Sequence, residues 1–245
     1  MRLSHLNPCR GVCGLLRRDP HDSAIAPQVA LLQDSALQLM NDILLHYIDD
    51  DLLLAEKPAG LLSVPGRAEE NRDCVVARLQ AIYPDALTVH RLDQVTSGLL
   101  LHARGKVMQA ALSAQFERRQ VGKRYEALVH GLVEGEHGEI ALPLRCDWPN
   151  RPKQMVDVEL GKPALTRWRV MSRDAAAQCT RVELEPVTGR SHQLRLHLAS
   201  IGHPIVGDVM YGAAPAARVC LHARSLAFVH PRSGRGMAFE SLPPF

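Results

Sequence analysis

Hydrophobic and polar residues alternate with two different periods through all but the first part of this chain. A period of two, typical of half-buried strands, runs through residues 123–131, 164–171 and 180–187. A period near that of an α-helix runs through residues 74–84 and 106–119. The pattern therefore predicts strands and helices interspersed along one chain.

Hairpin signals complete this pattern. Residues 43–58 predict two strands joined at an acidic turn, and residues 226–241 predict a second hairpin. A third helix is expected between Ser191, a candidate N-cap, and Gly202, a candidate stop. Hairpins interrupted by a few helices indicate an α+β fold, with a mixed, mostly antiparallel central sheet flanked by helices.

Residues 1–42 follow neither period. Their apolar residues are few and aperiodic until Val29, so we expect disorder there. An alternative is that translation starts at Met40. In either case, residues 43–245 are expected to form the functional domain.

Composition excludes some classes of protein and leaves others open. The 245 residues carry a formal net charge of +3, which alone does not indicate a nucleic-acid partner. No run of eighteen apolar residues occurs, so no membrane span is expected. The six cysteines include no CxxC pair, which favours reduced thiols in a cytoplasmic protein over zinc ligands or disulfides.

A polar segment, HRLDQVTSG at residues 90–98, lies between two apolar runs. Asp93 would sit there on a loop held by a rigid sheet, where reactive groups are often placed. Arg91 is two residues away. An ordinary turn with a surface ion pair explains this segment equally well.

Basic residues gather where a predicted strand passes into the third helix. Arg190, His192 and Arg195 are placed to bind a phosphate or a carboxylate, because the first-turn amides of a helix attract anions. The alternative is a core helix with Leu194 on its buried face. No metal is expected, because His192 and His197 lack the spacing of a same-face helical pair.

Tyr125 follows two cations on a predicted strand, a combination that suits an unstacked RNA base. A core position is the alternative. Residues 145–154, RCDWPNRPKQ, predict a long exposed basic loop around Trp148. Such a loop is a candidate surface for an RNA backbone, or simply a solvated loop.

Five motifs together resemble the RluA family of pseudouridine synthases, and their order and spacing agree with it from about residue 43 to the C-terminus. The combination of HRLD-x-x-TSG with GR-x-HQLR is highly specific. The motifs are KPAGLLSVPG (57–66), HRLDQVTSG (90–98), KRYEALV (123–129), GRSHQLRLH (189–197) and GHPIVGDVMYG (202–212).

The resemblance implies a pseudouridine synthase catalytic fold with an active-site cleft. It also implies isomerisation of uridine in structured RNA, in large-subunit rRNA and in tRNA anticodon stem-loops, without cofactor or metal. Asp93 stands at the catalytic aspartate of the family, and Arg190 at the basic residue that pairs with it. Tyr125 stands at the aromatic residue that packs on the target uracil. Arg91 stands where a side chain enters the space left by the flipped base.

His192 and Leu194 are expected to line the same RNA-binding site, and we expect a cytoplasmic monomer. Two alternatives belong to other classes. A nucleoside or sugar hydrolase would need a second carboxylate, which these motifs lack. A non-catalytic RNA-binding or RNA-folding protein of the same fold is disfavoured by the intact set of Asp93, Tyr125 and Arg190.

Overall fold

The computed structural model of the chain describes residues 43–245. The expectations for residues 1–42, with Cys9 and Cys13, lie outside the described residues. The elements run in this order: β1 (Leu44–Ile48), β2 (Leu52–Lys57), η1 (Glu69–Asn71), α2 (Val75–Gln80), β3 (Ala86–Thr88), β4 (Ser97–Arg104), α3 (Gly105–Glu117), β5 (Gly122–His130), β6 (His137–Ile140), β7 (Leu144–Cys146), η2 (Trp148–Asn150), β8 (Gln154–Val156), β9 (Thr166–Asp174), β10 (Cys179–Pro186), α4 (Gln193–Ser200), η3 (Val209–Tyr211), β11 (Leu221–Val229) and β12 (Gly236–Glu240).

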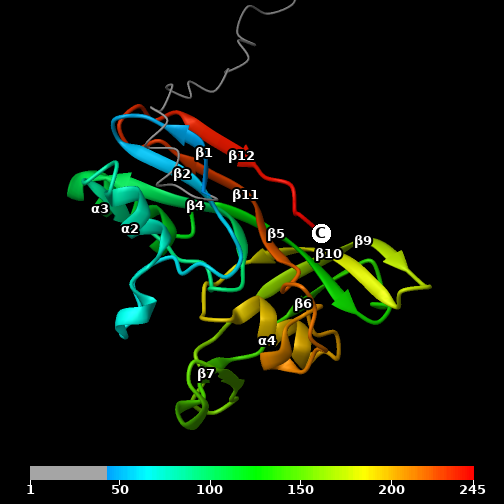
Figure 1. Cartoon of the computed structure of the whole chain (residues 1–245). Helices are drawn as coiled ribbons and strands as arrows, with labels where there is room; N and C mark the ends of the chain where they lie inside the picture. Colours follow the sequence, from blue (N-terminus) through cyan, green and yellow to red (C-terminus); the bar gives the residue numbers. More distant parts are fainter. Residues whose placement is uncertain (1–42) are drawn as a thin grey trace, which may run out of the picture.

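Ten of the described strands form one sheet, in the order β1-β2-β4-β11-β5-β10-β9-β6, with β3 paired to β4 and β12 paired to β11 (Figure 1). Every pairing in this sheet is antiparallel except that of β11 with β4. The predicted mixed, mostly antiparallel sheet is therefore confirmed.

The parallel pairing of β4 with β11 depends on a glycine. Gly98 has φ +111°, and a Cβ placed there would lie 2.4 Å from the carbonyl oxygen of Ala223. Only glycine allows the two backbones to approach so closely. This contact joins the N-terminal strands of the sheet to the C-terminal ones, directly after the segment that carries Asp93.

The expected hairpins and helices are found where the pattern placed them, with one difference in the basic segment. Strands β1 and β2, and strands β11 and β12, form the two predicted hairpins. Residues 145–154, expected as a long exposed loop, mostly form the connection between β7 and β8; the difference is that Arg145, Cys146 and Gln154 at its two ends pair as strands. Asp147 closes this hairpin, because its backbone N–H donates to Lys153 O at 3.0 Å and its carboxylate accepts from Asn150 Nδ2 at 2.9 Å.

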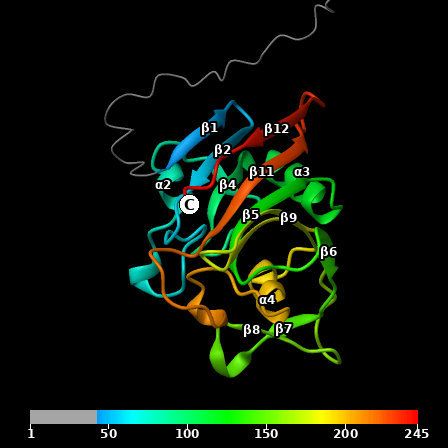
Figure 2. The same ribbon diagram turned by 90° about the vertical axis from the view of Figure 1, so that its right-hand side faces the viewer.

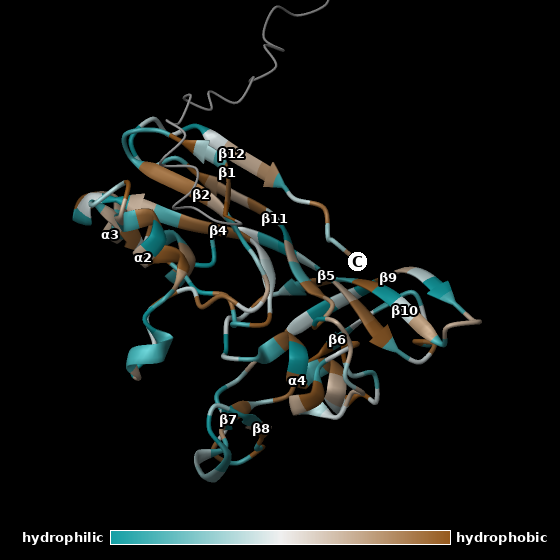
Figure 3. Cartoon of the chain, viewed as in Figure 1, coloured by the Kyte–Doolittle hydropathy of each residue, from teal (hydrophilic) through white to brown (hydrophobic). Residues whose placement is uncertain are grey.

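The helices leave the middle of the sheet uncovered. α2 and α3 pack near β3 and β4, whereas α4 packs against β9 and β10. Figure 2 shows α4 between the curved strands of the sheet and the β7–β8 hairpin. The strands beneath α2 and α3 are strongly apolar, and β2 is brown along most of its length in Figure 3, with residues 52–55 fully buried. β5 and β11 between these two groups of helices contribute the floor of a cleft.

No helix in the described part of the chain is long and apolar enough to cross a membrane.

Burial of a histidine in the core predicts how stability depends on pH. His102 on β4 is fully buried, and this burial lowers its pKa to about 4. From its ordinary pKa near 6.5 down to about pH 4, the unfolded chain binds a proton that the folded chain does not. As the pH is lowered through this window, the free energy of unfolding should therefore decrease by up to about 1.4 kcal/mol per pH unit because of this residue. Above about pH 6.5, His102 should not make the free energy of unfolding depend on pH.

His102→Leu should remove this contribution. Urea unfolding at several pH values should give a variant whose stability, relative to the parent chain, rises steadily between pH 6.5 and pH 4. If the free energies of unfolding of the two proteins changed in parallel with pH, the prediction would be contradicted.

Candidate active site

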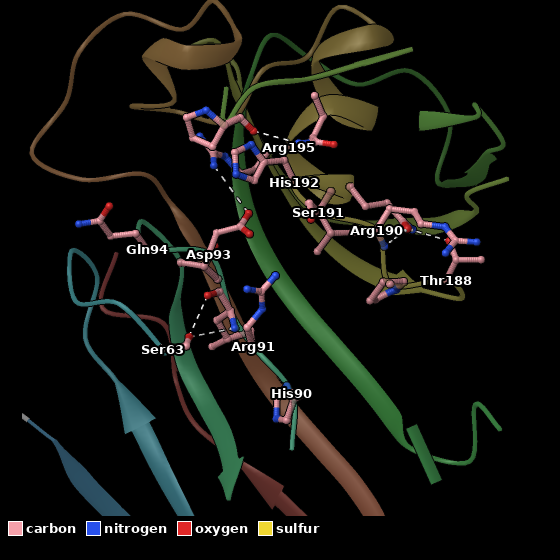
Figure 4. Close-up of a pocket in the computed structure, with 18 of the residues that line it drawn as sticks. Ser63, His90, Arg91, Asp93, Gln94, Thr188, Arg190, Ser191, His192 and Arg195 are labelled. Atoms are coloured by element: carbon pink, nitrogen blue, oxygen red, sulfur yellow. Dashed lines mark hydrogen bonds and ion pairs between the residues drawn. The ribbon is translucent and has the colours of Figure 1, made fainter. Parts of the chain in front are cut away.

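A cleft of about 1120 Å³ opens over the middle of the sheet. Its lining comes from segments that are far apart in the sequence. These are residues 62–67, 90–96, 116–125, 146–154 and 186–195, with Leu221 from β11. The motifs that are separated in sequence therefore meet in one place. Figure 4 shows their side chains around a common open space.

Asp93 lies on the loop between β3 and β4, and its neighbour Leu92 anchors that loop. Leu92 is buried, its N–H donates to Ser63 Oγ at 3.1 Å, and its carbonyl accepts from the same hydroxyl at 2.8 Å. A turn follows, closed by Thr96 N–H donating to Asp93 O at 3.0 Å. With Leu92 held inward, Arg91 is exposed and the Asp93 side chain is 27% exposed toward the cleft.

A buried lysine fastens this loop to the KPAG segment. Lys57 Nζ donates to three carbonyl oxygens, those of Pro58 at 2.8 Å, Leu61 at 2.6 Å and Gln94 at 2.9 Å. Burial lowers the pKa of Lys57 to about 7, and the nearby Asp93 charge partly opposes this shift. Three acceptors thus satisfy the three donors of the ammonium group and hold the backbone next to Asp93 in place.

The cation beside Asp93 is Arg195, not Arg190. Arg195 Nη1 lies 3.6 Å from Asp93 Oδ2, as an ion pair (Figure 4). The predicted pairing of Arg190 with Asp93 is wrong, because Arg190 is exposed and its Nε donates to Pro163 O at 3.1 Å. The helix begins at Gln193, and its N-cap is His192 and not the predicted Ser191. Arg190 precedes the helix and points away from Asp93 (Figure 4), while Arg195 lies in the buried first turn.

Asp208 fixes the orientation of Arg195. Arg195 Nε donates to Asp208 Oδ2 and Arg195 Nη2 donates to Asp208 Oδ1, both at 2.7 Å. The two side chains are only 4% and 1% exposed. Burial alone would lower the pKa of Arg195, but Asp208, and then Asp93, raise it above its ordinary value. This bidentate pair uses one edge of the guanidinium and leaves Nη1 facing Asp93.

Gly207 brings Asp208 close to its partner. Gly207 has φ +83°, and a Cβ there would lie 2.1 Å from Arg218 O. The segment is further held by Val206 N–H, which donates to Leu128 O at 2.9 Å, and by Cys220 N–H, which donates to Val206 O at 3.0 Å. The GHPIVGDVMYG motif is therefore a rigid support for the ion pair of Arg195.

Tyr125 forms part of the cleft wall and part of the core at once. It packs against both apolar clusters that meet at β5, and its half-buried ring lines the cleft. Burial, reinforced by the Asp93 charge, raises the pKa of Tyr125, so its hydroxyl stays protonated. Leu194 on α4 combines the same two positions, since it is 6% exposed within the core and also lines the cleft.

His192 has an unusual backbone that is held by Tyr211. It precedes α4 with φ +51°, in the left-handed region, and its Nδ1 lies 2.8 Å from Tyr211 Oη. Burial raises the pKa of Tyr211 to about 12, and Tyr211 Oη already accepts from Gln154 N–H at 3.0 Å. Burial lowers the pKa of His192, and the charge of Asp93 opposes this shift. The imidazole is therefore neutral, and its Nδ1 accepts a hydrogen bond from the Tyr211 hydroxyl.

Arg195 and Asp208 are the site residues that sequence reasoning underrated. The sequence places Arg195 among three residues suited to bind an anion, but the family resemblance assigns the ion pair with Asp93 to Arg190. A signal was present, because Arg195 alternates with Leu194, Leu196 and Leu198 in a run that is buried throughout. An arginine buried in a helix requires an anionic partner.

Potential metal ligands come together elsewhere in the described part of the chain. Asp49, Asp51 and His230 each offer a ligand atom, and these atoms lie within 4.8 Å of one another, outside the cleft. Arg232 Nε already donates to Asp51 at 2.6 Å, and His230 Nε2 lies 3.0 Å from Asp49 Oδ2. Binding of an ion there would have to displace these contacts.

Comparison with known proteins agrees with the fold. The family model of RNA pseudouridylate synthases matches residues 51–200, which is more than half of the chain. The dual-specificity RNA pseudouridine synthase RluA of Vibrio cholerae is 52% identical over 191 residues, covering 76% of this chain and 77% of the relative. The RluA protein of Escherichia coli is 47% identical over 207 residues, covering 83% and 94%. Among solved structures, human RNA pseudouridylate synthase domain containing 1 matches with a TM-score of 0.70 and 28% identity, covering 84% of this chain and 85% of that one.

The chain therefore belongs to the RNA pseudouridylate synthase family, whose members are isomerases. The relatives confirm the resemblance to RluA-type members that the five motifs indicated.

The geometry predicts that Arg195, and not Arg190, supports the reaction of Asp93. Removing Arg195 alone would leave Asp208 buried without a partner, at a cost of about 3–5 kcal/mol. The test variant is therefore Arg195→Met combined with Asp208→Asn. Its single-turnover rate should fall about 100-fold or more, as when a preorganised electrostatic contact is lost from an active site.

Arg190→Met is the matched comparison and should change the same rate by less than about threefold, because its side chain is exposed. Pseudouridine formation would be measured on one RNA with saturating enzyme, after thermal melting has shown that both variants are folded. Equal losses for the two variants would contradict the assignment.

Proposed function

We propose that this chain isomerises uridine to pseudouridine in folded RNA, and that its substrates include large-subunit rRNA and tRNA anticodon stem-loops. One observation carries the proposal: the Asp93 carboxylate faces an open cleft beside the buried guanidinium of Arg195. Tyr125 supplies an aromatic wall in the same cleft. The relatives named as dual-specificity RNA pseudouridine synthases support RNA as the substrate and more than one kind of target, while the choice of rRNA and tRNA follows from the resemblance of the five motifs.

The reaction rearranges bonds without net oxidation or reduction. The C1′–N1 bond of uridine breaks, a C1′–C5 bond forms, C5 loses a proton and N1 gains one. Asp93 suits this chemistry because Arg195 lies beside its Oδ2 and its other oxygen, Oδ1, stays free for the nucleotide. It can add to C1′ or C6 as a nucleophile, or remove the 2′ proton as a base. Each route requires the carboxylate to be ionised.

The target base must leave its stack before Asp93 can reach it, at a cost of about a few kcal/mol. Arg91 offers a group that can fill the vacated space. It lies two residues from Asp93, is exposed, and is directed into the same open space (Figure 4). An inserted guanidinium would stack on neighbouring bases and stabilise the extruded state.

The charge of the cleft suits a polyanion. Seven arginines and lysines line it, against the carboxylates of Asp93 and Glu117; the cations are Arg67, Arg91, Arg119, Lys123, Arg151, Arg190 and Arg195. The β7–β8 hairpin forms one rim, where the Arg151 guanidinium lies 3.1 Å from the centre of the Trp148 ring. Trp148 remains 64% exposed, so an aromatic face is available at the rim for an RNA base.

All the groups needed for this reaction come from one chain, which supports a monomeric enzyme. The proposed rRNA and tRNA substrates lie in the bacterial cytoplasm, where we place the protein. A non-catalytic RNA-binding role would leave the Asp93–Arg195 pair without a purpose, and the following substitution separates the two functions.

Asp93→Asn should abolish isomerisation while leaving RNA binding nearly unchanged, because it removes the charge and the nucleophile but little volume. Tritium release from C5-labelled RNA measures turnover, and filter binding measures affinity. Turnover close to that of the parent chain would show that Asp93 is not the catalytic group. If the parent chain itself forms no pseudouridine in rRNA or in tRNA, the non-catalytic alternative is favoured.

Arg91→Ala should slow catalysis more on a folded stem-loop than on an unstructured strand with the same target sequence, because extrusion of the base is costly only in the folded RNA. Single-turnover rates at saturating enzyme on the two RNAs test this. The Arg195→Met/Asp208→Asn variant is the comparison and should impair both substrates alike. Equal fractional losses for Arg91→Ala would leave Arg91 as an ordinary phosphate or structural contact.

A further inference from the structure

The C-terminal end of α3 has an arginine where the backbone favours glycine. Arg118 is the C-cap and Arg119 follows it with φ +58°. Gln120 N–H donates to Gln115 O at 2.9 Å, and Arg119 N–H donates to Phe116 O at 3.1 Å. These two bonds define a Schellman motif, in which the left-handed residue is usually glycine.

An arginine in this position costs conformational energy, which the interaction of its charge with the C-terminal end of the helix dipole offsets only in part. The left-handed region brings the Cβ of any L-residue close to the backbone. Residues held in such conformations cluster at functional sites, where the side chain is needed. Among the described non-glycine residues, φ is positive at Arg119, Gln178 and His192, and two of these three line the cleft.

The side chain of Arg119 shares the cleft with Lys123. Lys123 and Tyr125 are two residues apart on β5, so they face the same side of the strand, about 7 Å apart along it. Burial, and then the charge of Arg119, lower the pKa of Lys123. The two cations are thus near enough to repel each other beside the wall formed by Tyr125.

Neither cation is neutralised within the described part of the chain. Arg124 is paired with Glu185, whereas no ion pair involves Arg119 or Lys123 among residues 43–245. Glu117 lines the same cleft but is exposed and pairs with neither of them. Two like charges in a cleft, one of them half-buried, are stabilised by an anion that bridges them.

We propose that Arg119 and Lys123 together bind one backbone phosphodiester of the substrate RNA, next to the nucleotide that packs on Tyr125. The inference rests on the proposed function, because RNA is the polyanion that the cleft would receive. The planar guanidinium of Arg119 can donate two parallel hydrogen bonds to phosphate oxygens, and the Lys123 ammonium supplies a point charge. The strained arginine is retained for this contact and not for the fold.

Arg119→Gly separates the two roles, because it should improve the fold and weaken RNA binding. Glycine relieves the left-handed strain, so Tm should rise by about 2–4 °C. Binding of a stem-loop substrate, measured in the Asp93→Asn background to prevent turnover, should weaken about tenfold. The slope of log affinity against log salt should decrease by about 1. Arg118→Ala is the matched control: this neighbouring exposed arginine does not line the cleft, and affinity should stay within about twofold.

A chemical probe locates the phosphate. Stem-loops with a single neutral methylphosphonate, placed in turn on each side of the target uridine, should include one that binds weakly to the Asp93→Asn chain. In the chain that also carries Arg119→Gly, this methylphosphonate RNA should bind with the same affinity as the unmodified RNA, because the cation that contacts the phosphate has been removed.

Several results would overturn the proposal. Unchanged affinity in Arg119→Gly, a loss no larger than that of Arg118→Ala, or retained sensitivity to the methylphosphonate would each exclude a phosphate contact. A fall in Tm would show that the arginine supports the fold. Absence of pseudouridine formation by the parent chain is a different failure: it removes the proposed function, while the binding comparison still tests the phosphate site.

Discussion

The geometry of this protein depends on one buried guanidinium held between two carboxylates. Arg195 is almost inaccessible to water, and a charge in that position is tolerated only if its donors are satisfied. Asp208 satisfies one edge of it with two hydrogen bonds. Nη1 is therefore directed at Asp93, whose side chain is the most exposed of the three. Helix α4, the GHPIVGDVMYG segment and the loop after β3 must all be in place for this arrangement to form, so folding and assembly of the site are a single event.

Rigidity around the Asp93 carboxylate comes mainly from backbone contacts. Lys57 binds three carbonyls around the loop, Ser63 binds both backbone polar groups of Leu92, and Gly98 lets β4 join β11 immediately afterwards. Few of these contacts involve the side chains that would touch RNA. The residues in the cleft can therefore be exposed and charged while the segment that carries them remains fixed, as precise placement of a reacting group requires.

Two of the three described non-glycine residues with a positive φ lie at the cleft. His192 and Arg119 adopt left-handed backbone conformations at the two ends of the site, one before α4 and one after α3. His192 is hydrogen-bonded to Tyr211, whose hydroxyl also accepts a hydrogen bond from the backbone N–H of Gln154 in the β7–β8 hairpin. A conformation that the sequence does not favour locally persists because tertiary contacts impose it. Tyr211 thus connects His192, next to α4, with Gln154 on the hairpin that forms one rim of the cleft.

The sequence by itself determined the elements and the location of the chemistry. Periodicity predicted β5, β9, β10, α2 and α3, because burial on one face imposes a period that can be counted. Turn signals predicted the two hairpins. The motifs indicated the family and the Asp93 loop. Only the tertiary structure decided which cation meets Asp93, since Arg190 and Arg195 are both suited to an anion and the choice depends on which of them is held by a buried carboxylate. That carboxylate belongs to Asp208, thirteen residues further along the chain than Arg195. Local patterns do not contain such long-range contacts.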